Sequence, residues 1–110
     1  MPAELTEKEF SKHVNTKFVA TLDGGVQAEL ELDEVKGYPG HPGDQQGMER
    51  FSVYFKGPAT PFLPQHSYML QHEKMGEFEI FIVPLSRNEQ SSRYEAVFNY
   101  YKKKSDESEY

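Results

Sequence analysis

The chain of 110 residues contains no cysteine and no tryptophan, and it has no long apolar run. The absence of cysteine excludes a disulfide scaffold, a thiolate zinc site and a cysteine nucleophile. No apolar run approaches the roughly 20 residues that a membrane-spanning helix needs. The N-terminal sequence MPAELTEKEF also lacks the basic start and apolar core of a signal peptide. We therefore expect a cytoplasmic protein without a membrane partner.

Positive charge is scarce as well. Twelve Lys and Arg residues stand against eighteen Asp and Glu residues, which gives a formal net charge of −6. An acidic surface repels phosphate backbones, so we expect no nucleic-acid partner. The length suits one domain, which we assign to residues 1–101. The remaining segment 102–110, KKKSDESEY, has no apolar content to bury and is predicted to be a disordered tail.

What the chain does contain is a series of short apolar runs, each closed by Gly, Pro or a polar cluster, which is typical of antiparallel β structure. In the run from Val26 to Val35, for example, Val26, Ala28, Leu30 and Leu32 alternate with polar and acidic residues. The pattern predicts a mainly β fold of about six antiparallel strands, in a small meander barrel or sandwich, with closure into a barrel favoured. Strands are predicted over residues 17–22, 26–35 and 51–56, and over 67–73 with Tyr68 and Leu70 facing inward. A fifth strand has Phe78, Ile80 and Ile82 facing inward, and the last strand, 94–100, has Ala96 and Phe98 facing inward.

One short helix is predicted before the strands, over residues 7–14. Thr6 and Glu9 have the spacing of a capping box, and Leu5 and Phe10 have that of a hydrophobic staple. A helix of about two turns is not stable alone, so it must dock Phe10 and Val14 onto the sheet.

The segment Gly37–Gly47 is rich in Gly and Pro and is predicted to be a loop. It is either a connector or a binding loop, since long loops on rigid scaffolds often contain binding residues. The segment Gly57–Pro64 contains three prolines and is predicted to be extended, because proline fixes φ and is incompatible with a helix.

No motif in the sequence indicates catalysis, a cofactor or a metal. His66 and His72 flank the fourth predicted strand but lie about 20 Å apart on a regular strand, too far to share one ion. Glu29, Glu31 and Asp33 alternate on one strand and are interpreted as its solvated face. The nucleophile-elbow pattern G-x-S-x-G is absent. We therefore predict a protein that is not an enzyme.

Most of the aromatic side chains are expected in the core. Tyr54, Phe62 and Phe81 are the exceptions, because strand parity or a loop position directs them away from the inward set. They form the candidate interaction surface. Phe81 and Val83 also make their strand apolar on both faces, so this strand is either central and covered or in contact with a partner.

Five groups of residues have a combination of types and spacings that is found together elsewhere: Leu5-Thr6 with Phe10, Phe55–Pro58, Leu63-Pro64-Gln65 with Tyr68, Leu70 and His72, Gly76 with Phe81, Val83 and Pro84, and Tyr94–Asn99. Taken together, these segments resemble a bacterial family of small uncharacterised all-β domains, a domain of unknown function. The resemblance spans nearly the whole chain apart from the charged tail. Members of that family are often encoded beside phage-tail-collar-like proteins, which implies an accessory or structural part of a tail-like assembly. The resemblance implies no catalytic residues.

We therefore expect a non-enzymatic structural or protein-interaction module, whose partner is another protein or a second copy of the chain. The alternative is a small-ligand-binding β-barrel, because barrels with aromatic interiors can hold a ligand at their mouths.

Overall fold

The computed structural model describes residues 5–37 and 48–101, which form six β-strands, one short α-helix and one 3₁₀ turn. Strand formation follows the alternation of apolar and polar residues, and Gly or Pro residues stand near most strand ends. In chain order the elements are α1 (Glu7–Ser11), β1 (Lys17–Thr21), η1 (Asp23–Gly25), β2 (Gln27–Gly37), β3 (Met48–Pro58), β4 (His66–His72), β5 (Gly76–Arg87) and β6 (Ser91–Tyr101).

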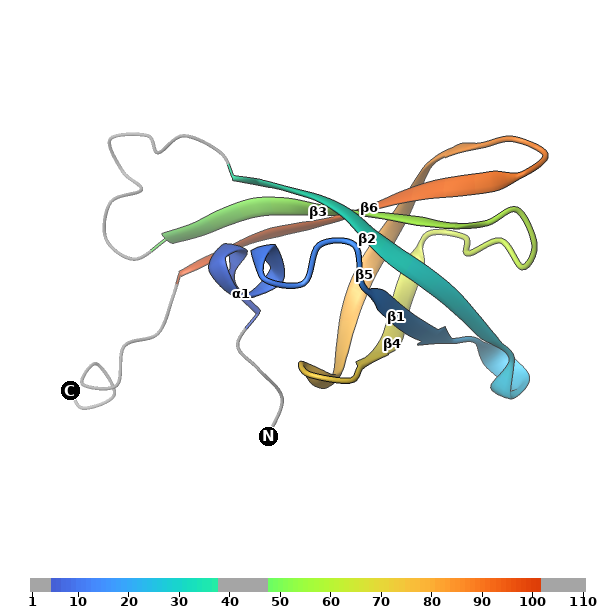
Figure 1. Ribbon diagram of the computed structural model, residues 1–110, viewed down its shortest axis with the longest axis horizontal. Coiled ribbons are helices and arrows are strands. Elements are labelled where there is room, and N and C mark those ends of the chain that lie inside the picture. The colour runs from blue at the N-terminus through green and yellow to red at the C-terminus, as the bar shows by residue number, and fades with distance from the viewer. Residues whose placement is uncertain (1–4, 38–47, 102–110) are drawn as a thin grey trace.

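The six strands close into an antiparallel barrel in the order β1-β2-β3-β6-β5-β4 (Figure 1). The predicted mainly β barrel with a short N-terminal helix is thus confirmed. The strands do not follow a plain meander, however, because β4 returns to pair with β1 and β3 pairs with β6. Three consecutive strands with a fourth beside the first form a Greek key.

The link from β3 to β4, residues 59–65, explains this departure from a meander. It contains prolines and runs from one side of the barrel to the other instead of forming a tight hairpin. Leu63 in this link is fully buried, and its backbone N–H donates to the hydroxyl of Tyr94 on β6 at 3.1 Å. The link therefore places an apolar side chain in the core as it crosses.

Side chains fill the barrel interior, and strand parity places them as the sequence pattern predicts. The inward residues of β2, β4, β5 and β6 named above are buried, with two exceptions, Phe98 and Val26. Phe98 is half-buried against the core. Val26 is 51% exposed, because β2 begins at Gln27 and Val26 belongs to the turn after η1. The largest fully buried side chains are Tyr94, Phe10, Phe18, Phe51, Phe55, Leu30, Leu32, Leu63, Leu70, Met75, Ile82 and Val53.

The N-terminal helix is shorter than predicted but docks as predicted. The Thr6 hydroxyl accepts the backbone N–H of Glu9 at 3.1 Å, and the helix ends at Ser11. Asn15 adopts a positive φ of 72° in the turn that follows. Phe10 is fully buried among the rings of four other phenylalanines, at centroid distances of 5.5–6.3 Å: Phe18, Phe51, Phe78 and Phe98.

The length over which neighbouring strands pair differs around the barrel. Strands β3 and β6 pair along their whole length, from Met48 with Tyr101 to Pro58 with Ser91. Strands β5 and β6 pair only from Val83 with Glu95 to Arg87 with Ser92. Beyond that point the two strands diverge, and β6 continues beside β3 (Figure 1). The Phe10 ring of α1 fills the space between Phe98 of β6 and Phe78 of β5.

Two sequence predictions lie largely outside the described residues: the disordered tail 102–110 and the loop Gly37–Gly47. Gly37 itself pairs with Phe51 and is the last residue of β2, so the predicted loop begins one residue too early. Among the described residues, no helix has the length and apolar character needed to cross a bilayer.

Candidate functional site

An apolar patch lies on the outer face of β4 and β5, and we define it as Met69, Phe81 and Val83. Phe81 is 50% exposed and Met69 is 44% exposed, while Val83 is half-buried. The strand register pairs Phe81 with Ser67 and Met69 with Glu79, which makes Phe81 and Met69 diagonal neighbours. Long side chains in that relation reach one another across the sheet. The outer apolar patch is therefore contiguous and open to solvent.

Acidic side chains border the outer apolar patch. Glu77 and Glu79 on β5 and Glu73 after β4 are exposed, and Glu77 accepts a hydrogen bond from the Gln71 side chain at 2.6 Å. The patch therefore combines hydrocarbon at its centre with carboxylates along one side.

Of the three predicted interaction residues, only Phe81 belongs to this patch. Tyr54 lies on the outer face of β3 with the Arg93 guanidinium 4.8 Å from its ring centroid. Phe62 lies in the β3–β4 link, with the Arg87 guanidinium at 4.7 Å and the Tyr94 ring at 6.0 Å. Both rings are half-buried. The predicted surface is thus three separate positions, two of which are covered by arginine side chains.

Arg93 is held in place by the β-bulge of β2. The bulge between Leu32 and Glu34 breaks the regular alternation, so that Asp33 and Glu34 both reach Arg93, each at 3.1 Å. Glu29 pairs with Lys17 at 3.6 Å. The acidic side chains on this strand therefore make surface ion pairs with neighbouring strands, in line with their interpretation as a solvated face.

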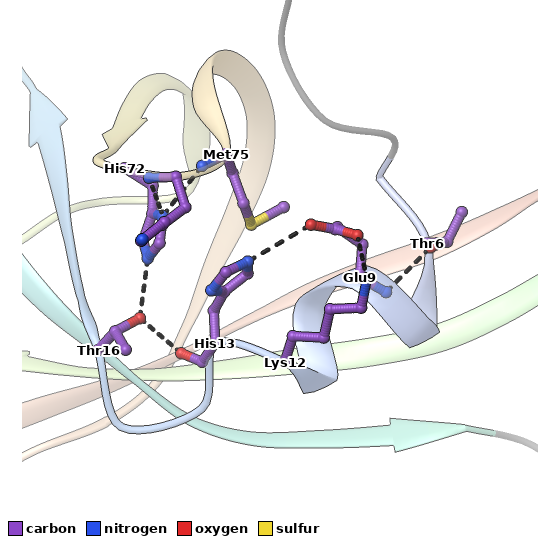
Figure 2. A network of polar contacts seen from close by, with 8 residues as sticks. Thr6, Glu9, Lys12, His13, Thr16, His72 and Met75 are labelled. Carbon is purple, nitrogen blue, oxygen red and sulfur yellow. Dashed lines mark hydrogen bonds and ion pairs between the residues drawn. The ribbon is translucent and has the colours of Figure 1, made fainter.

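A polar network joins the chain around α1 to the end of β4 (Figure 2). His72 is buried, and its Nδ1 accepts the backbone N–H groups of Lys74 at 3.0 Å and Met75 at 3.1 Å. Its Nε2 lies 2.9 Å from the Thr16 hydroxyl, which donates to the His13 carbonyl at 2.6 Å. His72 is therefore neutral with its proton on Nε2, since Nδ1 meets two donors and the Thr16 hydroxyl is left to accept.

Burial lowers the pKa of His72, and the neighbouring His13 lowers it further. The His13 and His72 rings lie 4.6 Å apart, and His13 Nε2 lies 3.4 Å from the Glu9 carboxylate. The Phe18 ring lies 4.3 Å from the His72 ring on another side. No sequence pattern predicts this pair of histidines, because they are 59 positions apart and only barrel closure brings them together. Within residues 5–37 and 48–101, no group of three or more His, Cys, Asp or Glu could hold a metal ion.

A cavity of about 630 Å³ lies at the end of the barrel where η1 and the β3–β4 link meet. Its walls include Leu22, Val26, Pro61, His66 and Tyr68. The Tyr68 hydroxyl donates to the Pro64 carbonyl at 2.6 Å, so the link is fastened to β4 at this cavity. The cavity is a groove between a turn and a link, separate from the packed barrel interior.

These features define a small Greek-key β-barrel with a filled core and an exposed apolar patch on one outer face. The sequence from residue 5 to residue 98 matches the family model of DUF6916, a domain of unknown function. The chain belongs to this family, so the predicted resemblance to a domain of unknown function is confirmed. No curated protein and no solved structure matches the chain.

Proposed function

We propose that this protein is a non-enzymatic interaction module that acts in the cytoplasm and binds a partner protein through the outer apolar patch. The observation that supports the proposal most directly is the exposure of Phe81, an aromatic ring at the centre of the patch that is half open to solvent. Aromatic side chains are enriched at protein interfaces and contribute a large share of their binding free energy.

The strand pairing beneath the outer apolar patch and the charges beside it favour binding of a partner protein. The patch is formed by β4 and β5, which pair over seven successive positions from His66 with Ile82 to His72 with Gly76. Its backbone is therefore held rigidly before a partner arrives, which reduces the entropy lost on binding. The carboxylates of Glu77 and Glu79 beside the patch favour a partner surface with apolar and basic side chains.

The resemblance described above suggests a setting for this module. The resemblance implies a family encoded beside phage-tail-collar-like proteins, and on that basis we propose an accessory part of a tail-like assembly. This setting is an association and does not identify the partner.

The proposal predicts that Phe81→Ala weakens partner binding without unfolding the protein. Loss of a central aromatic contact costs about 2 kcal/mol or more of binding free energy, so retention of the partner should fall at least about tenfold. The measurement is affinity capture from the source cells, with co-purifying proteins quantified by mass spectrometry and the melting temperature recorded for each variant.

Val26→Ala is the matched control, because Val26 is also about half exposed but lies at the turn after η1. We expect the control to retain the same partner at the wild-type level. Equal retention by wild type, Phe81→Ala and Val26→Ala would exclude the outer apolar patch as the binding site.

A second function, binding of a small ligand, is favoured by the cavity at the barrel end. Its volume of about 630 Å³ lies within the usual range for ligand sites, about 300–1,000 Å³. Native mass spectrometry of freshly purified protein distinguishes the two functions. A retained small molecule that is lost in Tyr68→Ala but kept in Phe81→Ala would support the ligand site.

A further inference from the structure

The cavity at the end of the barrel lies where β1 and β4 stop pairing. The last paired position of these two strands is Thr21 with Met69. After Thr21 the chain turns away into η1, whereas β4 extends to His66 and there pairs only with β5 among the described strands. The cavity of about 630 Å³ occupies the resulting opening, and the β3–β4 link forms its other side.

Hydrogen bonds within the protein hold both sides of this cavity in place. The backbone N–H of Leu22 donates to the Val26 carbonyl at 2.6 Å, and that of Gly25 donates to the Leu22 carbonyl at 3.2 Å, so the η1 turn is closed. On the opposite side, the Tyr68 hydroxyl donates to the Pro64 carbonyl at 2.6 Å. The walls are therefore formed before a ligand arrives, which reduces the entropy lost on binding.

The walls of the cavity are mainly apolar and include two rings. Leu22, Val26 and Pro61 contribute hydrocarbon. The rings of His66 and Tyr68 lie edge to face with their centroids 5.6 Å apart, and Tyr68 is buried while His66 is exposed. Walls of this composition favour a compact ligand with an apolar or aromatic body.

Asp23 gives the cavity a negative charge. It is one of the lining residues, and none of the described residues that line the cavity is a lysine or an arginine. Burial raises the pKa of Tyr68, and Tyr94 and the Asp23 carboxylate raise it further, so the carboxylate is close enough to act on the phenol. Within residues 5–37 and 48–101, no cation forms an ion pair with Asp23. The cavity therefore attracts positive charge beside its apolar walls.

We propose that this cavity binds a small organic cation, in which an ammonium group is joined to a compact apolar or aromatic body. The ammonium group lies beside the Asp23 carboxylate, and the body packs against Tyr68 and Pro61. An ammonium group next to an aromatic ring also gains a cation–π attraction. The inference rests on the second function proposed above, binding of a small ligand, and names the class of that ligand.

Three probes of similar size separate the effect of charge from that of apolar shape: phenethylammonium, phenylethanol and phenylpropionate. NMR titration of the isotope-labelled full chain at pH 8 reports binding at individual amides, because histidine side chains are then neutral and the ammonium group stays protonated. We expect saturable shifts at the amides of 23–26 and 66–68. The affinity for phenethylammonium should exceed that for either other probe about fivefold or more.

Asp23→Asn tests the source of this preference. It should lower the affinity for phenethylammonium to about that for phenylethanol. Asp33→Asn is the matched control, because it makes the same change at an exposed aspartate of β2 outside the cavity, and it should bind like the wild type. Val26→Lys places a positive charge on the cavity wall at a half-exposed position, so it should weaken binding of phenethylammonium and strengthen binding of phenylpropionate.

Equal affinity for the three probes, or no binding of any of them, would overturn the proposal. An Asp23→Asn variant that binds phenethylammonium like the wild type would overturn it too. A neutral or acidic molecule retained in native mass spectrometry and lost in Tyr68→Ala would keep the ligand site but overturn its assignment to a cation. Failure of the Phe81→Ala test leaves the assignment unaffected, because Phe81 lies on β5 and does not line the cavity.

Discussion

At the scale of single residues, both ring nitrogens of the buried His72 make hydrogen-bond contacts, to Thr16, Lys74 and Met75. Two backbone N–H groups of the turn between β4 and β5 donate to its Nδ1, and Met75 in that turn is fully buried. A protonated Nδ1 cannot accept either bond. The charge state of His72 is thus coupled to the conformation of the turn and to the contact between Thr16 and β4.

This coupling predicts that stability falls at mildly acidic pH. The pKa of His72 is lowered in the folded state by burial and by His13, against an ordinary value of 6.5, while Glu73 acts in the opposite direction. Below pH 6.5 the unfolded state takes up a proton that the folded state does not bind. The free energy of unfolding should therefore decrease as pH falls from 6.5 through the folded pKa, by at most about 1.4 kcal/mol per pH unit for one group.

Chemical denaturation at a series of pH values measures this effect, and His72→Asn is the control. An asparagine can still accept backbone N–H groups but does not titrate. The slope of stability against pH below 6.5 should be smaller in the variant than in the wild type. Identical slopes in the two proteins would show that His72 is not the group responsible.

At the scale of elements, α1 depends on docking more than on its own propensity. It has five residues, too few to persist alone in water. Phe10 packs against four phenylalanine rings between diverging strands, whereas Thr6 supplies a single cap. Tertiary contacts therefore account for most of the stability of this helix.

We accordingly expect Phe10→Ala to lower the free energy of unfolding by about 3–5 kcal/mol, as loss of a buried aromatic ring does. Thr6→Ala should cost less, about 0.5–2 kcal/mol, because it removes only the cap. Denaturant unfolding of both variants checks the order. An equal or larger loss in Thr6→Ala would mean that Phe10 does not anchor the helix.

At the scale of the whole molecule, the crossing link between β3 and β4 determines the strand order. The buried N–H of Leu63 donates its hydrogen bond to the hydroxyl of Tyr94, a residue 31 positions away on β6. This contact attaches the β3–β4 link to β6. Loss of this hydrogen bond should therefore lower the free energy of unfolding of the whole barrel.

Tyr94→Phe should therefore cost about 1–3 kcal/mol, because it leaves a buried N–H without an acceptor. Tyr68→Phe removes a hydroxyl from the same region but frees only the carbonyl of the exposed Pro64, which water can reach. We expect the second variant to be the more stable of the two in thermal unfolding. The reverse order would show that the Leu63 contact contributes little.

Local patterns were sufficient to predict which face of each strand is buried. The alternation through Ala28, Leu30 and Leu32 and through Phe78, Ile80 and Ile82 depends only on the period of two along a strand. The Thr6 cap and the docking of Phe10 were also predictable, because capping and stapling involve residues within five positions of one another. Helix length was overestimated, since the turn at Asn15 ends the segment in favour of pairing with β2.

Patterns of exposure were predicted only in part. Phe81 is exposed as its parity indicated, but Tyr54 and Phe62 are covered by Arg93 and Arg87. Those arginines lie more than 20 positions along the chain from the rings that they cover. Only the β-bulge of β2 and the β5–β6 hairpin bring them into place.

The amino-acid sequence by itself determined the strand-rich character of this protein, the inward and outward parity and the capped helix, because each depends on residues close together in the chain. Tertiary structure alone decided the Greek-key order, the meeting of His13 with His72 and the end of the β5–β6 pairing at Glu95. Each of these depends on how the barrel closes, which brings His13 and His72 together although they are 59 positions apart. Short-range periodicity does not encode contacts at that separation, so the neighbours of each side chain across the barrel could be identified only after the strands were placed.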